Sequence, residues 1–120
     1  MHVRLSKTFR FEAAHWLPTF PEGHKCRRLH GHSFHVEVVV AGAVPPDRGY
    51  LVDYGEIKAA VAPVIDQLDH YCLNDIPGLE VPTAENLAAW LWQRLRPALP
   101  QLAAIVVNET CTSSCTYAGE

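Results

Sequence analysis

Two histidines, His30 and His32, flank a single glycine. In a β-strand, residues two positions apart point to the same face, with Cα atoms roughly 6–7 Å apart. Imidazole is the commonest zinc ligand, and a tetrahedral ion needs donors that converge in this way. A third histidine, His15, ends the apolar side of an earlier alternating stretch. The three predict a zinc site with an open fourth position, the alternative being buried histidines bonded to backbone.

Cys26 precedes His30 by four residues and is followed by two arginines. Neighbouring cations or a metal favour the thiolate, which is the reactive form of cysteine. Cys26 is therefore a candidate nucleophile or base. Two other interpretations remain open from the spacing: a fourth zinc ligand that closes a structural site, or a small buried hydrophobic residue.

Two further features carry polar groups that chemistry could use. Asp69 and His70 stand at the expected end of a helix, where the dipole stabilises a cationic imidazole. Sequence neighbours rarely face each other, so the pair need not form a mutual hydrogen bond. Beside a zinc site and a cysteine, this pair is a candidate proton relay. Glu109 shares a strand face with apolar residues, where a carboxylate is costly unless paired. It suits a ligand with two parallel N–H donors, the alternative being a salt bridge with an arginine.

Two long strands must position these groups. Apolar and polar residues alternate over residues 3–15 and again over about 30–43, which is typical of half-buried antiparallel strands. The three histidines lie at the end of the first apolar face and at the start of the second. If the strands pair, all three meet near the loop formed by residues 17–25, which contains two prolines and a glycine.

The remaining chain predicts two helices and further strands. Asp53 and Thr83 are candidate N-caps, each before an apolar stripe of helical period. Residues 50–52 read as a short third strand and 104–109 as a fourth, and the tail, 111–117, as a turn with a last edge strand. The order β-β-β-α-α-β predicts an α+β fold: an antiparallel four-stranded sheet with two helices on one face.

Composition is that of a small globular protein. The chain has 120 residues, 48% hydrophobic and 19% charged, which predicts one domain over residues 1–120. A formal net charge of −3 argues against a nucleic-acid or anionic-membrane partner. With no apolar run of roughly 18–20 residues and no signal-peptide core, we expect a cytoplasmic protein, no membrane partner and reduced thiols. The cysteines are Cys26, Cys72, Cys111 and Cys115.

Taken together, these motifs resemble the 6-pyruvoyltetrahydropterin synthase superfamily, and within it the carboxy-type enzymes of bacterial queuosine biosynthesis. The resemblance runs nearly end to end, through Phe11-Glu12-Ala13-Ala14-His15, Glu22-Gly23-His24-Lys25-Cys26, Leu29-His30-Gly31-His32-Ser33-Phe34, Leu68-Asp69-His70, Leu73-Asn74-Asp75-Ile76-Pro77-Gly78-Leu79-Glu80, Pro82-Thr83-Ala84-Glu85 and Glu109-Thr110-Cys111-Thr112. It implies a tunnelling fold whose subunits join their sheets into a barrel, a homohexamer built as a dimer of trimers, and active sites between subunits.

The resemblance also assigns a role to each candidate residue. It implies Zn²⁺ on His15, His30 and His32, a proton-abstracting thiolate at Cys26, a relay at Asp69 and His70, a pterin anchor at Glu109, and further pterin contacts at Thr83 and Glu85, although capping explains Thr83 equally well.

The implied substrate is 7,8-dihydroneopterin triphosphate, a small pterin. Zinc would acidify its side-chain hydroxyls, triphosphate would leave, and carbon–carbon cleavage would release acetaldehyde and 6-carboxy-5,6,7,8-tetrahydropterin, which is a lyase reaction. Three residues between Cys26 and His30 match the carboxy type, whereas the pyruvoyl type carries a longer insertion. Pyruvoyl-type elimination and a non-catalytic structural-zinc protein remain alternatives. The candidates for holding triphosphate are the basic residues His24, Lys25, Arg27 and Arg28.

Overall fold

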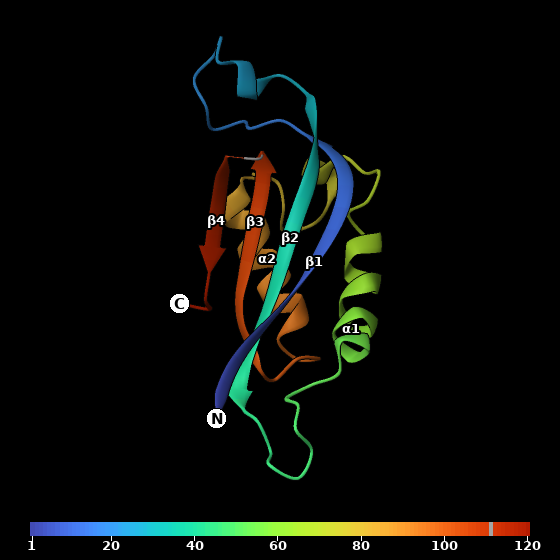
Figure 1. Cartoon of the computed structure of the whole chain (residues 1–120). Coiled ribbons are helices and arrows are strands. Elements are labelled where there is room, and N and C mark those ends of the chain that lie inside the picture. The colour runs from blue at the N-terminus through green and yellow to red at the C-terminus, as the bar shows by residue number, and fades with distance from the viewer. Residues whose placement is uncertain (111) are drawn as a thin grey trace.

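The computed structural model describes residues 1–110 and 112–120, so Cys111 and its part of the tail prediction lie outside the described residues. One antiparallel sheet runs through the molecule, with both helices on the same face (Figure 1). Its strands are β1 (His2–His15), β2 (His30–Ala43), β3 (Leu102–Thr110) and β4 (Ser113–Tyr117), adjacent in that order. The predicted α+β class and the four-stranded antiparallel sheet are confirmed.

β1 and β2 form a long hairpin that determines the shape of the protein. Each strand has 14 residues and therefore spans about 46 Å, in a molecule 58 Å long and 23 Å across. The register pairs Phe11 with Phe34 and His15 with His30. The predicted alternation is therefore correct, and it brings the histidines to the end of the hairpin where residues 16–29 form the connecting loop (Figure 1).

The helices begin where the sequence predicts. Asp53 caps α1 (Tyr54–Asp66): its side chain accepts the backbone N–H two residues on, at 3.0 Å. Thr83 caps α2 (Ala84–Leu95) by accepting the N–H three residues on, at 3.1 Å. Each bond satisfies a donor that the first helical turn leaves unpaired.

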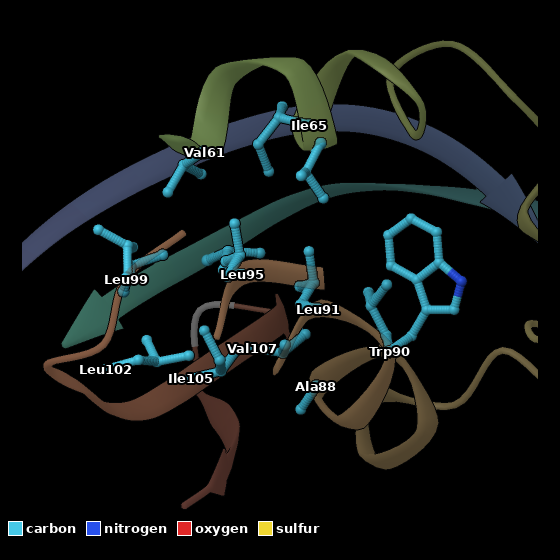
Figure 2. Close-up of a cluster of buried hydrophobic side chains, with 14 of the residues drawn as sticks. Val61, Ile65, Ala88, Trp90, Leu91, Leu95, Leu99, Leu102, Ile105 and Val107 are labelled. Atoms are coloured by element: carbon cyan, nitrogen blue, oxygen red, sulfur yellow. The ribbon is translucent and has the colours of Figure 1, made fainter. Parts of the chain in front are cut away.

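The core lies between these helices and the sheet. Figure 2 shows its side chains meeting in one layer: Val61 and Ile65 from α1, Leu91 and Leu95 from α2, Ile105 and Val107 from β3. Toward the loop end of the hairpin this layer continues as the stacked rings of Phe11 and Phe34, 5.0 Å apart. The histidines beyond them therefore lie next to buried aromatic side chains of the core.

The predicted third strand over residues 50–52 is wrong. Leu51 and Val52 are apolar because they are buried in the core, but they lie in an irregular segment before α1 and pair with no described strand. The fourth strand is instead β4, the edge strand expected from the tail, and the observed order is β-β-α-α-β-β. Burial alone cannot distinguish a strand from a buried connection.

Cys26, Cys72 and Cys115 are free thiols, as expected for reduced cysteines. Neither described helix has the length and apolarity needed to cross a membrane.

Candidate metal centre and adjoining cavities

The rings of His15, His30 and His32 converge at the loop end of the β1–β2 hairpin. Their centroids are 4.6 Å (His15 to His30), 5.0 Å (His15 to His32) and 4.8 Å (His30 to His32) apart. One ring nitrogen of each lies within 4.8 Å of the other two. Pairing of His15 with His30 across the strands, and the two-residue step to His32, produce this arrangement. The predicted convergence is confirmed, and the group can hold a metal ion.

Backbone carbonyls orient two of the rings. His15 Nδ1 lies 2.8 Å from the carbonyl oxygen of Pro82, and His30 Nδ1 lies 2.7 Å from that of Arg28. A carbonyl only accepts, so each Nδ1 carries the proton and each Nε2 keeps its lone pair. His15 Nε2 is fully buried and has no hydrogen-bond partner. A buried, unpaired, unprotonated nitrogen aimed at two other imidazoles fits a metal ligand.

Burial favours the neutral form of two of the rings, those of His15 and His32. It lowers the pKa of His15 to about 4, with the charges of His30 and His32 adding and the bond to Pro82 opposing. It also lowers the pKa of His32, again with His30 adding. Neutral imidazoles offer lone pairs to a metal. Within the described part of the chain, no cysteine or carboxylate joins the converging donor atoms of the trio, and the Cys26 thiol lies outside this group.

Cys26 lines a cavity, the metal cavity, together with two of the three histidines, His30 and His32. This cavity, about 390 Å³, is lined by Leu17, Lys25, Cys26, His30, His32, Glu109 and Thr110. Cys26 sits half-buried in a short 3₁₀ turn, Lys25–Arg27, and its carbonyl accepts the N–H of Leu17 at 2.9 Å. The structure therefore brings together the predicted metal ligands, the thiol and Glu109.

Of the four basic residues in this loop, two have structural partners. The Arg27 guanidinium donates to the carbonyls of Pro18 and Phe20, at 3.0 and 2.9 Å. His24 stacks on Phe20 and its Nδ1 accepts the N–H of Cys26. The candidates left for holding triphosphate are Lys25, which lines the metal cavity, and Arg28, which lines an adjacent one.

Glu109 stands between two cavities. Its Oε2 lies 4.0 Å from His32 Nε2, and it also lines a second cavity of about 400 Å³ with Glu85 and Cys115. Burial raises the pKa of Glu109; the charge of His30 lowers it and that of Glu85 raises it further. Among the described residues no arginine forms a salt bridge with Glu109; the contact recorded for its carboxylate is with the His32 imidazole.

Asp69 and His70 contact each other, which the sequence had left open. His70 Nδ1 lies 3.0 Å from Asp69 Oδ2. The backbone of His70 is left-handed, with φ of 65°, and this turn brings the neighbouring side chains together. Asp69 Oδ1 accepts the N–H of Glu12 at 2.9 Å. That bond, and then the bond to His70, lower the pKa of Asp69, so Asp69 is held as a carboxylate beside the His70 ring.

The segment after Asp69 is bound to the outer edge of β1. His70 N donates to the carbonyl of Glu12 at 2.6 Å, and Ala14 N donates to that of Tyr71 at 3.1 Å. His70 of the dyad thus lines a cavity of about 550 Å³, and the other lining residues are Glu12, Ala13, Ala14, Gly31, His32, Ser33, Tyr71 and Cys72. Cys26 does not line this cavity, so a single chain separates the thiol from the relay.

Comparison with known proteins identifies the family of the chain. Residues 4–120 match the model of the 6-pyruvoyl tetrahydropterin synthase family. The chain belongs to this family. It is similar to the 6-carboxy-5,6,7,8-tetrahydropterin synthase of a Synechocystis strain, 48% identical over 92% of this chain and 89% of that one. It is also similar to the dihydroneopterin monophosphate aldolase of Pyrococcus furiosus, 38% identical over 83% and 81%.

The fold is that of the family. The solved 6-pyruvoyl tetrahydropterin synthase of Caenorhabditis elegans superposes with a TM-score of 0.91 at 26% identity, over all of this chain and 97% of that one. This chain therefore has the fold of the pterin synthase family, an enzyme family, and carries a histidine trio at one end of its β1–β2 hairpin.

Two site features escaped the sequence analysis because backbone atoms carry them. The carbonyls of Pro82 and Arg28 hold histidine rings, and no side chain signals this. The hydroxyl of Thr83, expected to contact the pterin, accepts a hydrogen bond at the N-terminus of α2. Glu85, the other expected pterin contact, lines a cavity with Glu109.

Proposed function

We propose that the protein is a zinc-dependent 6-carboxy-5,6,7,8-tetrahydropterin synthase of queuosine biosynthesis. It converts 7,8-dihydroneopterin triphosphate and one water molecule to 6-carboxytetrahydropterin, acetaldehyde and triphosphate, a carbon–carbon lyase reaction. The observation that carries the proposal is 48% identity over 92% of the chain with a relative of that name. A cavity lined by Cys26 and by two histidines of the converging trio, His30 and His32, supports it.

His15, His30 and His32 hold the zinc ion in this proposal. Bound zinc supplies Lewis acidity that lowers the pKa of a hydroxyl group. Cys26, half-buried in the same cavity, takes a proton from the substrate side chain as a thiolate. Neutral, carbonyl-anchored imidazoles suit the ligand role, and the absence of Cys26 from the converging group leaves its thiol free for that step.

Glu109 anchors the pterin through two N–H donors. Its burial raises its pKa, so a ligand that brings hydrogen-bond donors relieves the cost of the buried carboxylate. Glu85 lies in the same cavity and is placed to contact the ring. Thr83 acts there indirectly, by fixing the first turn of α2 on which Glu85 stands.

The relay of Asp69 and His70 reaches the thiol across a subunit interface in this proposal. Within one chain the dyad and Cys26 line different cavities. The sheet ends in two outer strands, β1 and β4, and unpaired edges are templates for pairing with another chain. Closing the sheets into a barrel, as a homohexamer of two trimers, would bring the dyad of one subunit to the thiol of another.

The test incubates zinc-loaded protein with 7,8-dihydroneopterin triphosphate and follows acetaldehyde and 6-carboxytetrahydropterin by mass. Equal amounts of both are expected, and zinc-loaded protein that yields no acetaldehyde would defeat the proposal. Cys26→Ala is the informative variant: it should keep zinc and lose turnover. Weak zinc binding in that variant would instead indicate a structural site closed by sulfur.

Pyruvoyl-type synthesis is the second candidate, because the family model and the superposed nematode enzyme carry that name. This reaction eliminates triphosphate and keeps all carbons of the side chain. A product two carbons heavier than 6-carboxytetrahydropterin, without acetaldehyde, would identify it. Dihydroneopterin monophosphate run in parallel tests the aldolase activity named for the Pyrococcus relative.

A further inference from the structure

Asn74 makes a two-point contact that neither the metal site nor the thiol explains by itself. It lies half-buried in the short 3₁₀ turn Leu73–Asp75. Its Oδ1 accepts the backbone N–H of Trp16 at 3.0 Å, and its Nδ2 donates to the carbonyl of the same residue at 2.7 Å. A side-chain amide thus pairs with both polar groups of one residue, as strands pair with each other. Both bonds fix the residue that directly follows a metal ligand.

The residue that Asn74 holds lies at a corner of the chain between two functional groups. On one side is His15, whose ring is also bonded to Pro82, further along the segment that carries Asn74. On the other side is Leu17, whose N–H holds the carbonyl of Cys26 at 2.9 Å. Among the described residues, no other side chain bonds to both the N–H and the carbonyl of Trp16.

We propose that Asn74 is a positioning residue, whose amide sets the Cys26 thiol against the histidine trio by fixing the corner at residues 15–17. The inference deepens the proposed function and rests on it for the use of the thiol. Without the amide, the corner and the segment ending at Pro82 can shift relative to each other. The orientation of the His15 ring and the position of Cys26 then both become less well fixed.

Two variants separate hydrogen bonding from packing. Asn74→Ala removes both bonds to Trp16, and with them two longer contacts, the bond donated to the Glu80 carbonyl at 3.5 Å and the one accepted from the Cys72 thiol at 3.8 Å. Asn74→Asp has nearly the same size and still accepts from Trp16, but it loses the donated bond and sets a carboxylate oxygen against the Trp16 carbonyl. Asp53→Ala is the matched control, because it also removes one side-chain-to-backbone bond, at the cap of α1, and Asp53 lines neither the metal cavity nor that of the dyad.

The first readout is metal binding. Purified metal-free proteins are titrated with Zn²⁺ against a competing chelator, and with Co²⁺, whose visible absorption reports ligand geometry. We expect both Asn74 variants to bind zinc about tenfold more weakly than the wild type, the lower end of effects for groups that orient ligands, with a changed cobalt spectrum. Asp53→Ala should match the wild type in both.

The second readout is the thiol. Alkylation of Cys26 by iodoacetamide is followed by mass spectrometry of its peptide in metal-free protein, and we expect several-fold faster modification in both Asn74 variants only. Wild-type zinc affinity, cobalt spectrum and alkylation in both would overturn the proposal, as would equal changes in Asp53→Ala. Neither readout uses the pterin, so absence of acetaldehyde in the wild type refutes the proposed function alone.

Discussion

Two neighbouring cavities both have His32 in their linings: one is lined by Cys26 and His30, and the other by His70 of the Asp69–His70 dyad. The metal trio and the dyad beside these cavities differ in their exposure to solvent. His15 is completely buried and burial lowers its pKa to about 4. The His70 side chain is 77% exposed and contacts a carboxylate whose pKa the Glu12 N–H lowers. The first arrangement excludes protons and favours a metal, and the second keeps an imidazole beside an anion in contact with solvent.

Both arrangements are anchored to the end of one strand. Backbone groups of Glu12 hold the dyad at the edge of β1, and Pro82 holds the ring of His15 three residues later. Because both sites are anchored to the same end of β1, they differ in how deeply their side chains are buried and in the face of the strand on which they lie. Breaking either set of contacts should change one cavity and spare the other.

The largest expected effect comes from removing a metal ligand. His30→Ala should weaken zinc binding by more than about a hundredfold, beyond what loss of an orienting group costs, and abolish acetaldehyde production. Equilibrium competition with a chelator measures it. The matched control is His35→Ala, on the same strand but on its exposed face, which should bind zinc as the wild type does. Unchanged zinc affinity in His30→Ala would remove this histidine from the site.

The next effect tests whether the two cavities cooperate across subunits. Cys26→Ala and His70→Ala should each lose most activity while the trio keeps its zinc. Mixing the two inactive variants under conditions that exchange subunits should restore a measurable part of the activity, because some interfaces then pair an intact thiol with an intact dyad. Mixtures that stay inactive, although mass spectrometry shows mixed oligomers, would mean that no interface unites the two cavities.

The sequence predicted the trio because period-two alternation fixes both strand face and pairing. The three histidines, His15, His30 and His32, continue the apolar faces of their strands. The antiparallel register then places His15 opposite His30, so that the three rings meet. It also predicted both helix caps, since Asp53 and Thr83 satisfy orphan donors locally. Features determined within a few residues, or by strand parity, are accessible to this reasoning.

Other features depend on groups that no residue type signals. The contact between Asp69 and His70 needs a left-handed backbone at a non-glycine residue, which pairing with β1 imposes from outside. The carbonyls of Pro82 and Arg28 are available at every position of any chain. The segment at residues 50–52 was mistaken for a strand because its burial comes from packing without pairing.

A smaller effect follows from the buried imidazole. The pKa of His15 is lowered from an ordinary 6.5 to about 4, so between these values the unfolded chain binds a proton that the folded protein does not. Metal-free protein should be fully stable above pH 6.5 and lose about 3 kcal/mol as pH falls to 4. Urea unfolding across this range measures it. His15→Gln should flatten the dependence, and an equal slope in that variant would assign the proton elsewhere.

The smallest effect concerns Glu109 and sets stability against binding. Burial raises the pKa of this carboxyl, so at pH 7 the folded protein carries a charge that it disfavours. Glu109→Gln should therefore stabilise metal-free protein modestly at pH 7, and the gain should vanish near pH 4, where the carboxyl is protonated in folded and unfolded chains alike. Pterin affinity should fall at the same time, because the amide replaces an acceptor by a donor. Thermal unfolding at the two pH values and pterin titration measure the two effects, and a destabilised Glu109→Gln would show that the charge is needed by its neighbours, with His32 at 4.0 Å the first to examine.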